Sequence, residues 1–358
     1  MLYDRLDPAH QARVAHLTRD PGFYGLLVTA STTKAVDRDS ALLLLTLRTP
    51  GPIPQYALRA LGGNAGRTVA GLVLDGILEI EHEGVFRSGA AAVSLVGEAS
   101  GDDAATGVID RLSIDAVRYA ASLPIRETSI LAGRLYRYNQ IPLTPRYQRA
   151  YEAESDDVRL GLAVPRAAAI LARSWTRVSP TGAPWMSWIA RREVDRPGER
   201  QGTYKLYVSP AVDAVRWVFP EVLGAVTSHR PFACKVGKGM YGLLRADKMV
   251  IYFARRDDLH GAASAVADAL SGVSAQGVPF SSAITADGLL SWGIDPPDDV
   301  GLAGLLRSES WRERLTNQMA AALVGASPRG DGLDAVVRFV LRRLEAHGID
   351  VRTWRPAS

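Results

Sequence analysis

The sequence predicts an α+β protein in which a small winged-helix-like module and a helical connector precede a mixed or antiparallel sheet flanked by helices. Two patterns lead to this fold class. Between residues 204 and 253, three short segments alternate apolar and polar residues, as half-buried strands do, and helical patterns follow them. Before residue 90, three short helical patterns lead into two short strands. At 358 residues the chain is long enough for two or three domains, which we place at 1–95, 108–190 and 191–358.

The composition is that of an ordinary soluble protein, with 47% hydrophobic and 22% charged residues. The net charge of +4 suits an anionic ligand such as a phosphate but is weak evidence for nucleic acid. The single cysteine, Cys234, excludes an internal disulfide and fits a reducing cytoplasm. The six histidines show no metal-ligand spacing, so we expect neither a metal nor another cofactor. The N-terminus is charged and no apolar run could span a bilayer, so we expect a cytoplasmic protein without a membrane partner.

The first 95 residues follow the order of a winged helix-turn-helix. A short strand over Gly25–Ala30 precedes three short helices that end near Leu47, Leu61 and Leu74. Glycine and proline residues separate these helices. Two short strands ending at Arg87 then form the wing.

Three roles compete for this module: DNA binding, peptide binding and a purely structural role. Its third helix carries Arg67 as the only cation and is followed by Asp75, which makes a poor surface for DNA phosphates. A leader peptide can instead add as an extra strand, as in small winged-helix modules of peptide-modification systems. We therefore rank the structural and peptide-binding roles above DNA binding.

The connector begins after a linker rich in Gly, Ala and Asp at 97–107. Apolar residues at helical spacing predict helices over 113–123, 128–138 and 158–173. The tryptophan-containing stretch 175–188 is expected to be rich in loops, and 191–201 to form an exposed hairpin tip.

The segment Tyr204–Pro210 combines an apolar row with an unusually polar one. Tyr204, Leu206 and Val208 fall on one face of the predicted strand, where they can be buried. Lys205 and Tyr207 fall on the other, so an amine and a phenol lie side by side.

The distribution of lysine also singles out this part of the chain. Of 42 Lys and Arg residues only five are lysines, and four of them lie between 205 and 248. Lysine can release its proton in a protein, whereas arginine cannot. The cluster therefore indicates a need for an amine, with chance or simple phosphate-binding charge as the alternatives.

Two further predicted strands, 232–236 and 248–253, place Lys235 and Lys248 opposite apolar rows. If the three strands share a sheet, their lysines can converge, attract a phosphate and lower one another's pKa. A neutral lysine is a competent general base. A solvated sheet face would carry the same lysines without chemistry, and the pattern alone slightly favours that interpretation.

Residues of about 108–356 resemble the HopA-type effector domain family, whose members include bacterial type III effectors and proteins of ribosomal-peptide biosynthesis. The resemblance rests on the order and spacing of several stretches. They are Leu135–Pro145, Tyr204–Pro210, Pro231–Val236, Arg245–Tyr252, Gly277–Phe280 and Ser308–Arg314.

This resemblance implies a phosphoserine/phosphothreonine lyase that acts on a phosphorylated precursor peptide, of lanthipeptide or thioamitide type, beside a partner Ser/Thr kinase. The related phosphothreonine lyases carry a Lys-x-His motif, in which the lysine is the base and the histidine the acid. Here Lys205 matches the lysine, and Tyr207 stands in the place of the histidine. For Tyr207 to donate a proton, its pKa would have to fall, which neighbouring cations favour.

The resemblance also implies phosphate-binding residues and no metal. Lys235 and Arg245 match the phosphate-binding positions, Arg216 is a third candidate, and Lys238 and Lys248 are weaker ones. Arg312 and Arg314 are expected on a solvated helix surface. Two other functions stay open: a non-catalytic phosphopeptide- or leader-binding partner of a kinase, and a winged-helix DNA-binding regulator.

Overall fold

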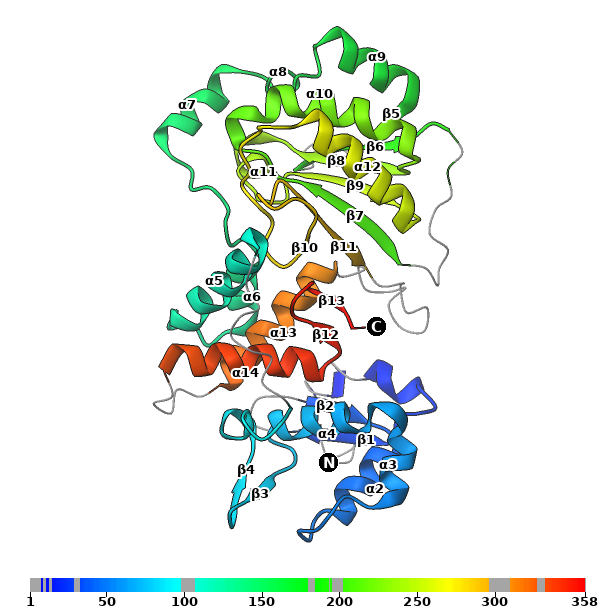
Figure 1. Ribbon diagram of the computed structural model, residues 1–358, viewed down its shortest axis with the longest axis vertical. Helices are drawn as coiled ribbons and strands as arrows, with labels where there is room; N and C mark the ends of the chain where they lie inside the picture. Colours follow the sequence, from blue (N-terminus) through cyan, green and yellow to red (C-terminus); the bar gives the residue numbers. More distant parts are fainter. Residues whose placement is uncertain are drawn as a thin grey trace.

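The helices and strands are stacked in three tiers along the long axis of the molecule (Figure 1). A large sheet with its helices forms one end, a helical tier lies in the middle, and the N-terminal module forms the other end (Figure 1). None of the helices in the described part of the chain is long and apolar enough to cross a membrane. The computed structural model describes residues 8, 11–12, 15–28, 33–97, 107–179, 184–192, 194, 202–295, 310–326 and 332–357.

The large sheet has seven strands, and every neighbouring pair is antiparallel, which confirms the predicted α+β class and the antiparallel alternative for the sheet. The three strands predicted from alternating sequence lie at its centre. In spatial order the strands are β10 (Ser282–Ala283), β11 (Leu290–Asp295), β7 (Thr203–Val208), β9 (Met249–Phe253), β8 (Ala233–Gly237), β6 (Trp185–Ala190) and β5 (Trp175–Arg177).

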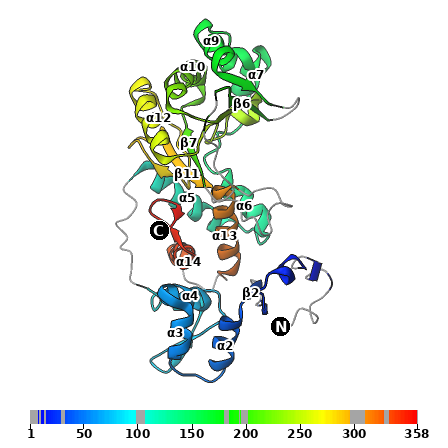
Figure 2. The ribbon, with the colours of Figure 1, turned by 90° about the vertical axis from the view of Figure 1, so that its right-hand side faces the viewer.

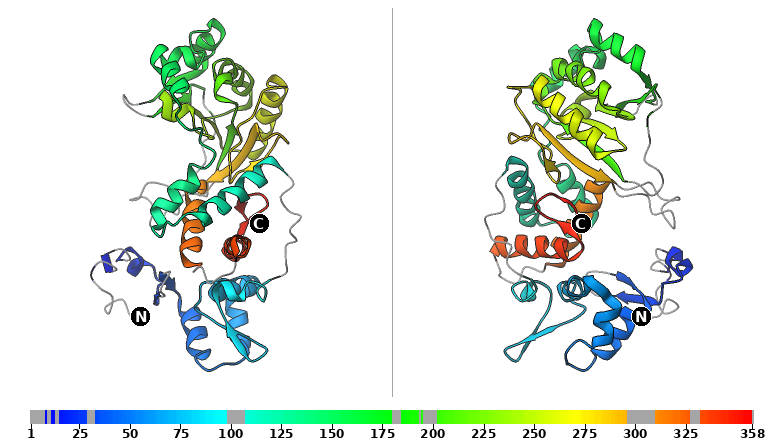
Figure 3. Two further views of the ribbon diagram at one scale, coloured as in Figure 1. Left: turned by 90° about the vertical axis from the view of Figure 1, so that its left-hand side faces the viewer. Right: turned by 45° about the vertical axis from the view of Figure 1, so that its right-hand side comes forward.

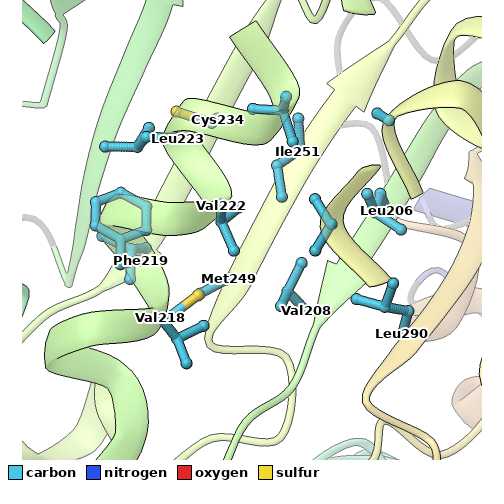
Figure 4. Packing of buried hydrophobic residues seen from close by; sticks show 14 of the residues in the cluster. Leu206, Val208, Val218, Phe219, Val222, Leu223, Cys234, Met249, Ile251 and Leu290 are labelled. Carbon is cyan, nitrogen blue, oxygen red and sulfur yellow. The ribbon is translucent and has the colours of Figure 1, made fainter. Parts of the chain in front are cut away.

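Two helices, α10 (Val215–Val226) and α12 (Arg256–Ala269), cover one face of this sheet. The apolar rows of β7 and β9 pack there against Val218 and Phe219 of α10 (Figure 4). Burial of such side chains contributes about 1.5–3 kcal/mol each to the free energy of unfolding. Helix α10 continues through Pro220, which lies inside it.

The predicted connector at 108–190 contains helices and also part of the sheet. The helices are α5 (Val108–Ser122), α6 (Thr128–Tyr136), α7 (Pro145–Ala153), α8 (Asp156–Arg159) and α9 (Pro165–Ser174). Strands β5 and β6 follow within 175–190, so the sheet begins before residue 191 and the expected loop-rich stretch is partly strand. Trp175 and Trp188 are buried but irregularly spaced. The alternation of buried and exposed residues that predicts a strand was therefore not recognisable in β5 and β6.

The middle tier combines α5 and α6 with two helices from the end of the chain, α13 (Trp311–Gly325) and α14 (Gly332–Ala346). Their apolar faces form a second core, into which Phe280 and Trp354 also insert. Two short strands, β12 (Ile349–Asp350) and β13 (Arg355–Pro356), follow α14. The sheet also carries a short helix between β8 and β9, α11 (Gly239–Leu243).

The N-terminal module has the predicted order of elements and one extra strand. Strand β2 pairs with β1 as an antiparallel hairpin that the sequence analysis did not anticipate. Three helices and a second two-stranded hairpin then follow in the expected order. The module comprises β1 (Gly25–Val28), β2 (Thr33–Val36), α2 (Arg38–Thr46), α3 (Gln55–Leu61), α4 (Ala65–Leu74), β3 (Ile80–His82) and β4 (Val85–Arg87).

A buried ion pair joins this module to the end of the chain. Helix α4 packs against α14 (Figure 2, Figure 3). Nε of Arg343 donates a hydrogen bond of 2.7 Å to Oδ1 of Asp75, and both side chains are buried. Nε2 of His347 lies 3.6 Å from the other carboxylate oxygen. The carboxylate of Asp75 therefore lies in the interface between α4 and α14 and does not face solvent.

Candidate functional site

Strand β7 divides its side chains between the two faces of the sheet, as its alternating sequence predicts. Leu206 and Val208 belong to the core beneath α10 and α12, so Lys205 and Tyr207 lie on the opposite face. Residues opposite each other on neighbouring strands share a face, and the register therefore adds side chains of β8, β9 and β11. We call this group the lysine face; it comprises Lys205, Tyr207, Lys235, Val250, Tyr252, Ser291 and Asp295.

Two lysines meet around one aromatic ring on the lysine face. The Nζ atoms of Lys205 and Lys235 each lie 5.6 Å from the centroid of the Tyr252 ring. Nζ of Lys235 also lies 4.5 Å from the ring centroid of Trp185, which β6 contributes. Both separations are within the range of cation–π attraction. The side chains of Lys205 and Lys235 thus converge, as the strand patterns predict.

Lys205 has a carboxylate partner that the sequence analysis did not identify. Its side chain is nearly buried and forms an ion pair with Asp295 at the end of β11. Asp295 is two residues beyond Gly293, which faces Lys205 directly across the strands. Lys205 and Asp295 therefore form a charged pair within the lysine face.

Lys235 is the lysine of this face whose amine is more easily neutralised. Burial, and then the nearby charge of Lys205, lower the pKa of Lys235 from 10.5 to about 8. No carboxylate of the described residues lies within ion-pair distance of its Nζ. A substantial fraction of Lys235 is therefore a neutral amine just above physiological pH, as a general base requires.

Tyr207 has the opposite property from the one expected. It is 5% exposed and packs against Ala246, Val250 and Val278. Burial raises the pKa of its phenol well above the ordinary value of 10, and the neighbouring Arg312 only partly offsets this. The role of proton donor requires this pKa to fall; Arg312 does lower it, but desolvation outweighs that effect. Tyr207 can donate a hydrogen bond, but it is a weak proton donor.

A carboxylate between two arginines borders the lysine face. Asp247 accepts hydrogen bonds from Arg245, with lengths of 2.8 and 3.0 Å, and one of 2.9 Å from Nη1 of Arg312. Burial alone would raise the pKa of Asp247, but Arg312 and Arg245 hold it well below its usual range. The guanidinium of Arg245 also lies over Trp185, the ring that Lys235 contacts. Arg245 therefore belongs to the same cationic group as Lys235.

Arg312 is the residue that the sequence analysis placed wrongly. It is 3% exposed, whereas we expected it on a solvated helix surface. Its guanidinium also donates to the carbonyl oxygens of Pro279 and Tyr136, and it lies 6.0 Å from the ring centroid of Tyr207. A cation in the first turn of a helix opposes the helix dipole. The position of Arg312 directly after Trp311 at the start of α13 was therefore a usable signal that it has a specific partner.

Three of the other predicted phosphate ligands lie outside this group. Arg216 is on α10, which covers the opposite face of the sheet, and its exposed side chain lies 3.5 Å from Glu154. Lys238 is at the N-cap of α11, beyond the end of β8. Lys248 is completely buried: it donates 2.9 Å to the carbonyl oxygen of Pro210 and also bonds the side chain of Gln276.

The buried Lys248 gives the protein a measurable pH dependence. Burial lowers its pKa from 10.5 to about 7, with Asp247 opposing the shift. Between these two values the unfolded chain binds more protons than the folded one, so the free energy of unfolding rises with pH. From pH 7 to 8.5 we expect Lys248 to contribute an increase of about 1–2 kcal/mol. Urea denaturation at several pH values measures this slope.

Lys248→Met is expected to remove this part of the slope, because a thioether does not titrate. Lys238→Met is the matched control, since Lys238 lies outside the buried network. Equal slopes for both variants would contradict the role given to Lys248. Denaturation is measured only up to pH 8.5. This limit lies below the ordinary pKa of a thiol, so that the buried Cys234 contributes little to the slope.

The lysine face supplies acid–base and anion-binding groups. It offers an amine that can be neutral (Lys235), an ammonium group held by a carboxylate (Lys205) and a guanidinium nearby (Arg245). Within the described ranges no three His, Cys, Asp or Glu side chains are grouped as metal ligands. The arrangement is suited to move protons beside a bound anion.

Comparisons with known proteins give only distant structural similarity. No protein-family model matches the chain, and no curated protein matches it significantly, so the HopA-type resemblance stays a prediction. An effector protein from Pseudomonas syringae pv. tomato strain DC3000 aligns with 71% of this chain and 99% of its own, at 14% identity and a TM-score of 0.41. An effector protein from Pseudomonas syringae pv. syringae strain 61 aligns with 70% of this chain and 98% of its own, at 12% identity and a TM-score of 0.38.

Proposed function

We propose that the lysine face eliminates phosphate from phosphothreonine or phosphoserine residues of a precursor peptide. The products are dehydrobutyrine and dehydroalanine, formed during maturation of a lanthipeptide or thioamitide in the cytoplasm. The observation that carries the proposal is the convergence of Lys205 and Lys235 around Tyr252, beside the guanidinium of Arg245. A Ser/Thr kinase is the partner that supplies the phosphorylated peptide.

The reaction needs one base, one acid and a cationic site for phosphate. The base takes the proton from the α-carbon, the C–H electrons form the double bond, and the bond from the β-carbon to the phosphate oxygen breaks. The leaving oxygen takes up a proton, so hydrogen phosphate departs. All groups come from the chain, and the scheme uses no metal or cofactor.

We assign the base to Lys235 and the acid to Lys205, which changes the roles that the family resemblance implies. Lys205 is ion-paired with Asp295, which holds its amine beside Tyr252 and Lys235. Lys235 has its pKa lowered to about 8, which favours the neutral form that a base needs. Tyr207 keeps its proton and donates a hydrogen bond, and Arg245 supports the departing anion by its charge.

One observation favours a second function, a non-catalytic phosphopeptide-binding partner of the kinase. The phenol of Tyr207 is buried and hard to ionise, and it occupies the position of the acid in the related lyases. A cationic sheet face can bind a phosphopeptide without turning it over. DNA binding is less well supported, because α4, the third helix of the module, packs against α14.

A single assay separates the two functions. The protein is incubated with kinase-phosphorylated precursor peptide, and the mass of the peptide is followed. We expect the loss of one phosphoric acid per reacting residue, and no loss with a double Lys205→Ala/Lys235→Ala variant. If the wild-type protein binds the phosphopeptide but its mass never changes, the lyase proposal fails and the binding function is supported.

A further inference from the structure

A cavity of about 490 Å³ lies on the other side of the sheet from the lysine face. It is formed by α9, the start of β5, the residues after β6 and the C-terminal end of α10. Its volume is in the range of pockets that bind small ligands. Trp175, which lines it, packs in the core with α10, so the cavity is distinct from the lysine face.

The cavity is strongly cationic. Three arginines line it, Arg166, Arg173 and Arg192, and none of its described lining residues is acidic. They come from the first turn of α9, the last turn of α9 and the segment after β6. Two serines and a threonine of the lining add hydroxyl groups. Arginine guanidinium and hydroxyl groups are the donors that bind phosphate oxygens.

Among the residues that the structure describes, a carboxylate balances the charge of one of these arginines. Nη1 of Arg166 lies 3.1 Å from both carboxylate oxygens of Glu221. A Cβ atom at Gly224, one turn further along α10, would lie 3.2 Å from the Arg166 guanidinium, so the glycine leaves room for it. For Arg173 and Arg192, no carboxylate of the described chain lies within ion-pair distance. Two positive charges therefore face the cavity without compensation by the described residues.

Stabilisation of helix ends accounts for only part of this arrangement. Arg173 is in the last turn of α9, where a cation interacts favourably with the helix dipole. Arg166 is in the first turn, where the same dipole disfavours it, and Arg192 lies outside any helix. The convergence of all three on one hollow points to a ligand rather than to the stability of α9.

We propose that this cavity is a second anion site, which binds a phosphate group. The group is either a phosphorylated side chain of a peptide or free inorganic phosphate, and both present the same tetrahedral oxygens to the arginines. The inference does not depend on elimination at the lysine face, since its readout is binding.

Calorimetric titration of the full chain tests this inference, with inorganic phosphate and with acetyl-Ala-phosphothreonine-Ala-amide as probes. The test variant is Arg173→Gln/Arg192→Gln. The matched control is Arg177→Gln/Arg216→Gln, which removes the same charge from exposed positions outside the cavity. Each titration is repeated in a Lys235→Met background, so that binding at the lysine face is recognised separately.

We expect the test variant to weaken phosphate-group binding at the cavity at least tenfold, while the control changes it less than threefold. A phosphopeptide that binds more tightly than free phosphate identifies a phosphorylated side chain as the ligand, and equal affinities identify free phosphate. If neither probe binds in the Lys235→Met background, or if test and control variants behave alike, the inference is wrong. These outcomes do not depend on whether the peptide loses phosphoric acid.

Discussion

Replacement of Lys235 by methionine is expected to lower the rate of phosphate elimination by about 10²–10⁴-fold, the usual contribution of a positioned general base. In the wild-type protein the rate should rise with pH and level off above pH 8, because the base is active only when deprotonated and its pKa is about 8. Methionine has a similar length, but its thioether sulfur is far too weakly basic to accept the α-proton. Rates from pH 6 to 9, measured by mass spectrometry of the peptide under single-turnover conditions, test this expectation.

Two further variants show which lysine is the base. Lys205→Met should also lower the rate. The increase with pH should persist, since Lys235 remains, but it should move to higher pH, because the charge of Lys205 helps to lower the pKa of Lys235. Arg314→Met is the matched control: it removes an exposed cation from α13 and should leave rate and profile unchanged. If Lys205→Met abolishes the rise with pH while Lys235→Met keeps it, the base is Lys205, as the family resemblance implies, and the assignment proposed above is wrong.

Asp247→Asn is expected to lower the free energy of unfolding by about 3–5 kcal/mol, the usual effect of removing one partner from a buried ion pair. The amide has the shape of the carboxylate but no charge, so the buried Arg312 and its neighbour Arg245 lose their common counter-ion. Urea denaturation at pH 7 measures the change. Asp213→Asn is the control, because Asp213 pairs with Arg146 at an exposed position, where a loss below about 1 kcal/mol is expected.

The same substitution should reduce the sensitivity of the protein to acid. The arginines hold the pKa of Asp247 below that of the unfolded chain, so the unfolded state binds the proton first as the pH falls. The stabilisation is therefore complete above about pH 5 and is lost progressively toward lower pH. In the Asn variant the free energy of unfolding should depend less on pH between 5 and 3. A variant as acid-sensitive as the wild-type protein would show that Asp247 carries no such stabilisation.

The sequence was informative wherever a local pattern determined the structure. The alternation in 204–208 predicted which side of β7 would carry Lys205 and Tyr207, because side-chain direction in a strand follows directly from residue parity. The scarcity of lysine identified Lys235 as a candidate, because lysine can release its proton and arginine cannot. This chemical difference does not depend on the fold. A sheet was expected from the same strand segments, which do not decide whether it is mixed or antiparallel.

The features of the lysine face and its border that the sequence did not reveal depend on contacts between residues distant in the chain. Asp295 lies beside Lys205 because β11 pairs with β7, and no local sequence pattern predicts the register of that pair. Arg312 reaches Asp247 across 65 residues. The net pKa of Tyr207 depends on how completely other elements exclude water from it, and this desolvation outweighs the effect of Arg312.

The pairing of Asp75 with Arg343 bears on the order in which the protein can assemble during translation. The two residues are 268 positions apart, so the ribosome completes the first module long before α14 emerges. Until then the carboxylate of Asp75 and the apolar side of α4 lack the surface that covers them in the finished protein. The N-terminal module is therefore made before α14 and reaches its final packing only when α14 has been synthesised.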